Sequence, residues 1–79
     1  MIDMYILIVC DYADAENVLS GIKNLEGVQD AYLLNGVYDI IVKISGQSFE
    51  ELERINSKIK SIIGVKATLT LTGYDPSAK

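Results

Sequence analysis

Hydrophobic and polar residues along this chain follow a strand–helix–strand order that occurs twice. Apolar runs of strand length alternate with segments whose apolar residues recur at helical spacing. The two helical segments follow Asp14 and Ser48. The sequence therefore predicts six elements in the order βαββαβ. The predicted strands are residues 4–10, 28–34, 37–44 and 65–72.

Both predicted helices carry signals at their ends. Asp14 is a favourable N-cap residue for the first helix. Ser48 and Glu51 form a capping box at the start of the second helix. Glycine follows each helix, as Gly27 and, 37 residues later, Gly64, which predicts a C-terminal cap at both places. The apolar faces of the helices are Val18, Leu19, Ile22 and Leu25 in the first, and Phe49, Leu52, Ile55, Ile59, Ile62 and Ile63 in the second.

This order of elements predicts an α+β fold. Two βαβ units with right-handed crossovers, joined by a hairpin, give a ferredoxin-like βαββαβ sandwich. We expect one domain over residues 1–79, with a four-stranded antiparallel sheet and both helices on one face. The first and third strands are the most continuously apolar, so they are predicted to lie in the middle of the sheet.

The pattern of apolar and polar residues along the predicted strands differs from that expected for a monomer. Helices cover only one face, so strands should alternate apolar and polar residues. The first strand is apolar on both faces, and Ile40-Ile41-Val42 breaks the alternation in the third. We therefore expect the helix-free face to pack against another sheet, most simply that of a second copy. The last strand does alternate, and its threonines, Thr68, Thr70 and Thr72, are expected on the less buried face.

The junction between the two halves holds the most informative residues. Asn35-Gly36 between apolar runs predicts a two-residue type I′ hairpin turn. Asp39 follows closely, and a carboxylate there is costly unless something satisfies it. The pattern favours a small-molecule or subunit contact site. An ordinary turn, with Asp39 binding loop amides, is the alternative, and the two roles are compatible.

Composition narrows the function classes. The chain has 79 residues, 49% of them hydrophobic, so its own core is small and self-association is expected. A net charge of −4 with scattered basic residues argues against binding nucleic acid, and no apolar run is long enough to span a membrane. Cys10 is the one cysteine and is expected to be buried and reduced, as in a cytoplasmic protein. Without histidine, a nucleophile beside a base or metal-ligand spacing, we expect no enzyme, no metal and no cofactor.

Three segments together resemble the effector-binding domain of the Lrp/AsnC family of amino-acid-responsive regulators, also called the RAM domain. They are Gly27-Val28, Gly36-Val37-Tyr38-Asp39 and Gly64-Val65-Lys66-Ala67-Thr68-Leu69-Thr70. Regulators of this family carry a helix-turn-helix before the domain, and this sequence has none. The chain is thus similar to a stand-alone form of the domain. The resemblance implies dimers formed through the sheets, and rings of dimers, often octamers.

The resemblance also implies where an effector binds. It places a small amino acid between dimers, at Asn35, Gly36, Tyr38 and Asp39. Backbone N–H groups near Gly36 would receive the ligand carboxylate, and Asp39 its ammonium group. Thr68 and Thr70 of a neighbouring subunit are further candidates, on side-chain type and strand position only.

Several functions fit this pattern. The leading hypothesis is a non-enzymatic amino-acid-binding domain that self-assembles and modulates a full-length Lrp/AsnC regulator. A purely structural oligomerisation partner is the first alternative. A small dimeric α+β-barrel enzyme, related to monooxygenases or muconolactone isomerases, would share the fold, and an ACT-type domain would share the fold and the ligand class. The sequence does not reveal which amino acid binds.

Overall fold

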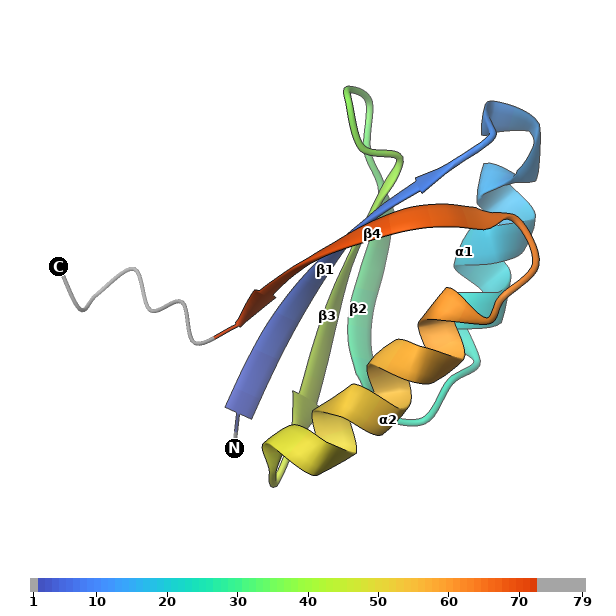
Figure 1. Ribbon diagram of the computed structural model, residues 1–79. Helices are drawn as coiled ribbons and strands as arrows, with labels where there is room; N and C mark the ends of the chain where they lie inside the picture. The colour runs from blue at the N-terminus through green and yellow to red at the C-terminus, as the bar shows by residue number, and fades with distance from the viewer. Residues whose placement is uncertain (1, 73–79) are drawn as a thin grey trace, which may run out of the picture.

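Four strands form a single antiparallel sheet, and both α-helices lie against one of its faces (Figure 1). The computed structural model describes residues 2–72. The strand order is β2-β3-β1-β4, so the first and third strands are central, as predicted. The ferredoxin-like α+β fold is thereby confirmed. The strands are β1 (Ile2–Cys10), β2 (Val28–Leu33), β3 (Ile40–Gly46) and β4 (Val65–Thr72), and the helices are η1 (Tyr12–Asp14), α1 (Ala15–Lys23) and α2 (Phe49–Lys60).

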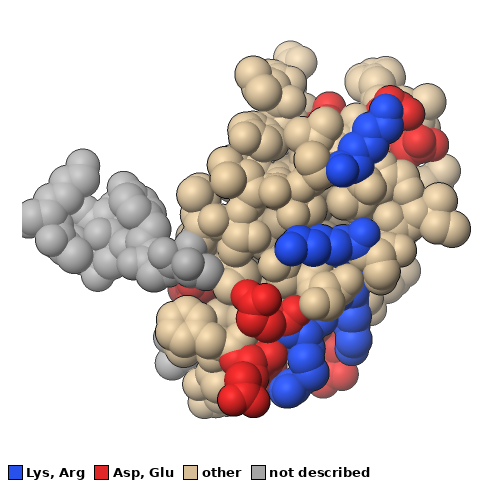
Figure 2. Space-filling model, in the orientation of Figure 1, with Lys and Arg blue, Asp and Glu red and all other residues tan. Residues whose placement is uncertain are grey.

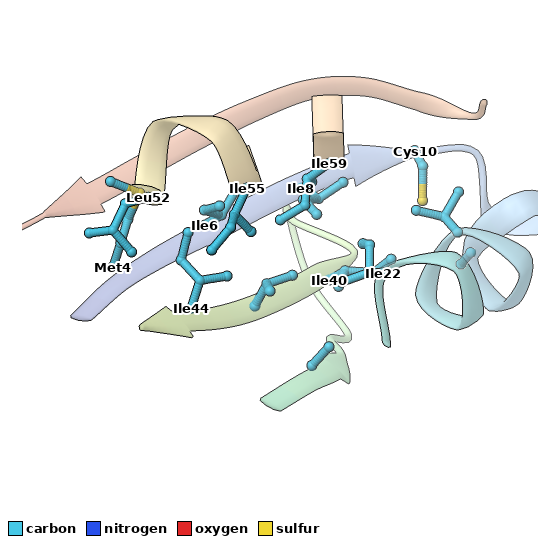
Figure 3. Close-up of a cluster of buried hydrophobic side chains, with 14 residues drawn as sticks. Met4, Ile6, Ile8, Cys10, Ile22, Ile40, Ile44, Leu52, Ile55 and Ile59 are labelled. Atoms are coloured by element: carbon cyan, nitrogen blue, oxygen red, sulfur yellow. The ribbon is translucent and has the colours of Figure 1, made fainter. Parts of the chain in front are cut away.

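The hydrophobic core lies between the helices and the sheet (Figure 3). Every second residue of β1 and of β3 faces the helices and is buried, which is the period expected of strands covered on that side. Cys10 is among these residues, so its predicted burial is confirmed. The fully buried large side chains are Met4, Ile6, Ile8, Val18, Ile22, Ile40, Val42, Ile44, Leu52 and Ile59.

The start of α2 follows its sequence signal, but the predicted glycine caps are wrong. Asn24 and Ser61 occupy the C-cap positions, three residues before Gly27 and Gly64, because each helix ends before the turn that contains the glycine. Ser48 Oγ accepts a hydrogen bond from the Glu51 N–H at 3.2 Å, as the capping box predicts. The Glu51 carboxylate binds the N–H of Gln47, one residue before the expected partner. Asp14 occupies the N-cap position of α1, but its side chain makes no capping hydrogen bond.

Two members of the predicted helix faces lie outside the core. Phe49 and Ile63 are 57% and 95% exposed, because Phe49 begins α2 and Ile63 lies in the turn after it. The others are buried or pack partly against the core.

The last strand presents the opposite faces from those predicted. A bulge between Val9 and Cys10 shifts the register, so that Val65 pairs with Cys10 and Ala67 pairs with Val9. Lys66 is the extra residue, and one extra residue exchanges the faces of everything that follows. Leu69 and Leu71 consequently lie on the helix-free face, and Thr68 and Thr70 lie on the helix side and are half-buried. The expected outward position of Thr68 and Thr70 is wrong.

One row of residues on the helix-free face of the sheet is apolar across all four strands. Register aligns Leu69 with Leu7, Leu7 with Ile41, and Ile41 with Tyr32, one residue from each strand. Tyr32 and Leu69 are 59% and 44% exposed. The doubly apolar β1 therefore leaves a hydrophobic surface open in the single chain. No helix in residues 2–72 is long and apolar enough to cross a membrane.

Candidate functional site

Residues 34–39 form an open loop between β2 and β3, which projects beyond the sheet (Figure 1). Neither Asn35 nor Gly36 has a positive φ, which both central residues of a type I′ turn require. The predicted two-residue turn is therefore wrong, and β3 starts at Ile40 rather than at residue 37.

Hydrogen bonds of the Asp39 backbone determine the shape of the loop. The Leu34 N–H donates to the Asp39 carbonyl at 2.7 Å and closes the loop there. The Asp39 N–H donates to the Ile8 carbonyl of β1 at 2.8 Å. The Asp39 carbonyl is thus bonded across the base of the loop and its N–H is bonded to β1, and residues 35–38 make no backbone hydrogen bond to other described residues.

The Asp39 carboxylate has a structural partner. Its Oδ2 accepts a hydrogen bond from the Cys10 N–H at 2.9 Å. Ile8 is the last residue of β1 in register with β3, where it pairs with Ile40, so Cys10 has no strand partner on that side. The carboxylate takes the place of that missing partner. Its second oxygen, Oδ1, accepts no hydrogen bond from the described residues.

A cleft of about 320 Å³ opens beside this carboxylate. It lies between the loop after β2 and the segment where β1 passes through η1 into α1. Asp39 and Glu16 contribute carboxylates, and the remaining walls are apolar or aromatic. The lining residues are Tyr12, Ala13, Ala15, Glu16, Leu33, Leu34 and Asp39.

The structure brings together only some of the predicted site residues. Asp39 lines the cleft, and Tyr38 is half-buried next to it in the chain. Asn35 and Gly36 are exposed in the loop and do not line the cleft.

The two threonines lie elsewhere in the chain. Thr68 is in register with Ile8, and Thr70 with Ile6, on the edge of β1 opposite β3. Within one chain they are therefore separated from the loop by the width of β1. Their contact with an effector in a neighbouring subunit stays a prediction.

Sequence reasoning missed the opposite wall of the cleft, which η1 and the start of α1 provide. Tyr12 is 93% exposed and Glu16 is exposed. The sequence does contain a signal that could have indicated this wall: the run from Asp11 to Glu16 has three acids and no basic residue. Only the fold places this run opposite Asp39.

The residues around Cys10, where β1 passes into η1 and α1, carry mostly negative charge. Burial, first, and then the charges of Asp39, Asp14 and Asp11 raise the pKa of the Cys10 thiol. Lys66 Nζ lies 2.7 Å from Asp11 Oδ1, and this contact raises the pKa of the lysine. A buried thiol with a raised pKa is a poor nucleophile. Within residues 2–72, no group of three or more histidine, cysteine or acidic side chains could hold a metal ion.

The comparisons with known families and known structures agree with one another. A model described as the Lrp/AsnC ligand binding domain matches residues 3–73. The chain is similar to the protein TTHA0845 from Thermus thermophilus, with a TM-score of 0.87 and 28% identity over 95% of both chains. It is also similar to AsnC of E. coli, with a TM-score of 0.82 and 28% identity, over 95% of this chain and 52% of that one.

A third similarity is to an enzyme. A segment of 46 residues is 41% identical to part of the homocitrate synthase of Sulfolobus acidocaldarius. The match covers 58% of this chain and 10% of that protein, so it involves only a small part of the enzyme.

Proposed function

Because the chain belongs to the Lrp/AsnC ligand-binding domain family, we propose that it is a non-enzymatic regulatory domain that binds a small amino acid. The observation that carries the proposal is the cleft in which the Asp39 carboxylate faces apolar walls. The family match supports a ligand in general, and the cleft supports an amino acid in particular.

The groups around the cleft suit both ends of an amino acid. Asp39 Oδ1 and the Glu16 carboxylate can accept charge-assisted hydrogen bonds from an ammonium group. The backbone N–H groups of residues 35–38 donate no hydrogen bond to other described residues. These residues do not line the cleft, so their N–H groups would bind the carboxylate of a ligand that reaches from the cleft to the loop. Asn35, Gly36 and Tyr38 enter the proposed site through these backbone groups rather than through their side chains.

Self-assembly is part of the proposed function. The apolar row from Tyr32 to Leu69 would be covered by the same face of a second copy, giving a dimer. Dimers would then assemble into a ring, with an octamer as the expected form, in which Thr68 and Thr70 of a neighbour could approach the effector. The same sheet face would allow a full-length Lrp/AsnC regulator to co-assemble with this chain.

A structural oligomerisation partner is the second candidate. One observation favours it: the Asp39–Cys10 hydrogen bond fixes the loop without any ligand. In that case the loop packs subunits together, and the cleft stays empty.

A thermal-shift panel of the twenty amino acids, with light scattering on each hit, distinguishes these candidates. A ligand that binds only the folded protein raises the melting temperature by mass action. A clear shift with one or a few amino acids, in an assembly larger than a dimer, is the expected result. A flat panel at millimolar concentration over a stable large oligomer would leave the structural role.

A further inference from the structure

Most of the described charge near the cleft is negative. Asp11, Asp14, Glu16 and Asp39, here called the acidic end, lie where β1 passes into α1 or face that segment across the cleft. Figure 2, in the orientation of Figure 1, shows acidic side chains at the upper right, where one basic side chain reaches them. Lys66 is a basic residue at this end, and its ammonium is held by Asp11.

The charged residues that line the cleft are also negative. Its described lining residues include two carboxylates, from Glu16 and Asp39, and no lysine or arginine. One oxygen of Asp39 is engaged by Cys10, and the other is free. A cleft lined by one sign of charge between low-dielectric walls focuses the field and concentrates ligands of opposite charge.

We propose that the effector of this cleft is an amino acid with a cationic side chain. This inference rests on the proposed function, and it adds the class of ligand. A neutral amino acid has no net charge, so the acidic end attracts its ammonium and repels its carboxylate. A basic amino acid carries one further positive charge, which a second carboxylate can bind.

The walls of the cleft suit the stem of such a side chain. Leu33 and Leu34 provide apolar surface on one side, and Tyr12 provides an aromatic ring on the other. Methylene groups of a long cationic side chain bury well against such surface while the charged end stays near polar groups. Asp39 and Glu16, on opposite walls, then offer one carboxylate to each ammonium group.

Calorimetric titration of the purified full chain tests the proposal with L-lysine and L-norleucine. Norleucine has the same carbon skeleton but lacks the side-chain ammonium. We expect lysine to bind about tenfold more tightly, as for one charge-assisted hydrogen bond, and the ratio to fall as salt is added. Norleucine binding as tightly as lysine would overturn the inference and leave the proposed function standing. Failure of every amino acid to bind would overturn both.

Two variants locate the effect. Glu16→Gln should weaken lysine binding more than norleucine binding, and so reduce the ratio of the two affinities several-fold. Glu53→Gln is the matched control, because Glu53 is an exposed carboxylate on α2 that does not line the cleft. Equal effects of the two variants would show general attraction by net charge and overturn the assignment to this cleft. Cadaverine binding as tightly as lysine would overturn the assignment to an amino acid.

Discussion

Gly27, in the turn after α1, packs directly against Ile55 of α2. Its φ is +93°, and a Cβ at this position would overlap Cδ1 of Ile55 and lie 3.2 Å from Cγ1. The second half of the chain repeats the contact in reverse. Gly64, 37 residues after Gly27, would bring a Cβ to 2.9 Å from Cγ2 of Val18, which is 37 residues before Ile55. In each half, a glycine in the turn after the helix therefore packs against the helix of the other half.

Replacing Gly27 by alanine should destabilise the domain strongly. The positive φ and the overlap with Ile55 each cost about 1–3 kcal/mol, so Gly27→Ala should lower the free energy of unfolding by about 2–6 kcal/mol. Urea unfolding followed by far-UV circular dichroism measures this change. Gly36→Ala is the control, because Gly36 has no positive φ and no atom within 4 Å of an added Cβ. Equal losses in both variants would contradict the packing role.

Adding Ile55→Val to Gly27→Ala separates the two costs. Valine lacks Cδ1, the atom that the new Cβ would overlap. The double variant should therefore be more stable than the sum of the single changes predicts, with the difference given by a double-mutant cycle. Simple additivity would assign the whole loss to the backbone conformation.

We expect Asp39 both to stabilise the fold and to bind the ligand, and two different substitutions of this residue should separate the two roles. Asp39→Ala leaves the Cys10 N–H without its acceptor, which should lower the free energy of unfolding by about 1–3 kcal/mol. Asp39→Asn keeps an oxygen that can accept from that N–H, so the variant should be nearly as stable as the parent. It removes the negative charge, so the variant should bind amino acids more weakly than the parent. Unfolding curves and the thermal-shift panel measure the two effects. Asp30→Ala, at an exposed position of β2, is the control for loss of a carboxylate.

The apolar row on the helix-free face should control dimerisation. Leu69→Lys places a charge beside Leu7, where a second sheet would desolvate it, so the dimer should weaken by at least about tenfold. Sedimentation velocity over a range of concentrations measures this. Ile63→Lys is the matched control, because Ile63 is 95% exposed in the turn after α2, away from the sheet face. Unchanged dimerisation of Leu69→Lys would place the subunit contact elsewhere.

The elements that the sequence predicted correctly depend on local signals. The order of the elements and the Ser48 cap depend on signals within a few residues, and both are as predicted. The repeated turns share their hydrogen bonds as well: Leu25 N–H binds Ile22, and 37 residues later Ile62 N–H binds Ile59. Local agreement of this kind fixed the order of elements and the central strands.

The errors came from contacts between residues far apart in the chain. The form of the 34–39 loop depends on bonds from Asp39 to Ile8 and Cys10, the latter 29 residues away. The faces of β4 depend on a bulge that shifts its register against β1. The wall of the cleft at Glu16 depends on where α1 begins relative to the loop. No short-range pattern encodes these distances, and of the residues predicted for the site only Asp39 lines the cleft.

The Cys10 thiol should make stability fall at alkaline pH. Its pKa in the folded chain is raised above the ordinary value of 9.0, by burial first and then by Asp39, Asp14 and Asp11. As pH rises past about 9, the unfolded chain therefore releases this proton first, binds fewer protons than the folded chain, and becomes relatively more stable. The stabilising contribution is complete below that pH and is lost as pH rises through the folded pKa. Urea midpoints at neutral pH and near pH 10 should thus fall more for the parent than for Cys10→Ala. Parallel curves for the two proteins would show that neither burial nor the neighbouring carboxylates raise the pKa of the thiol in the folded chain.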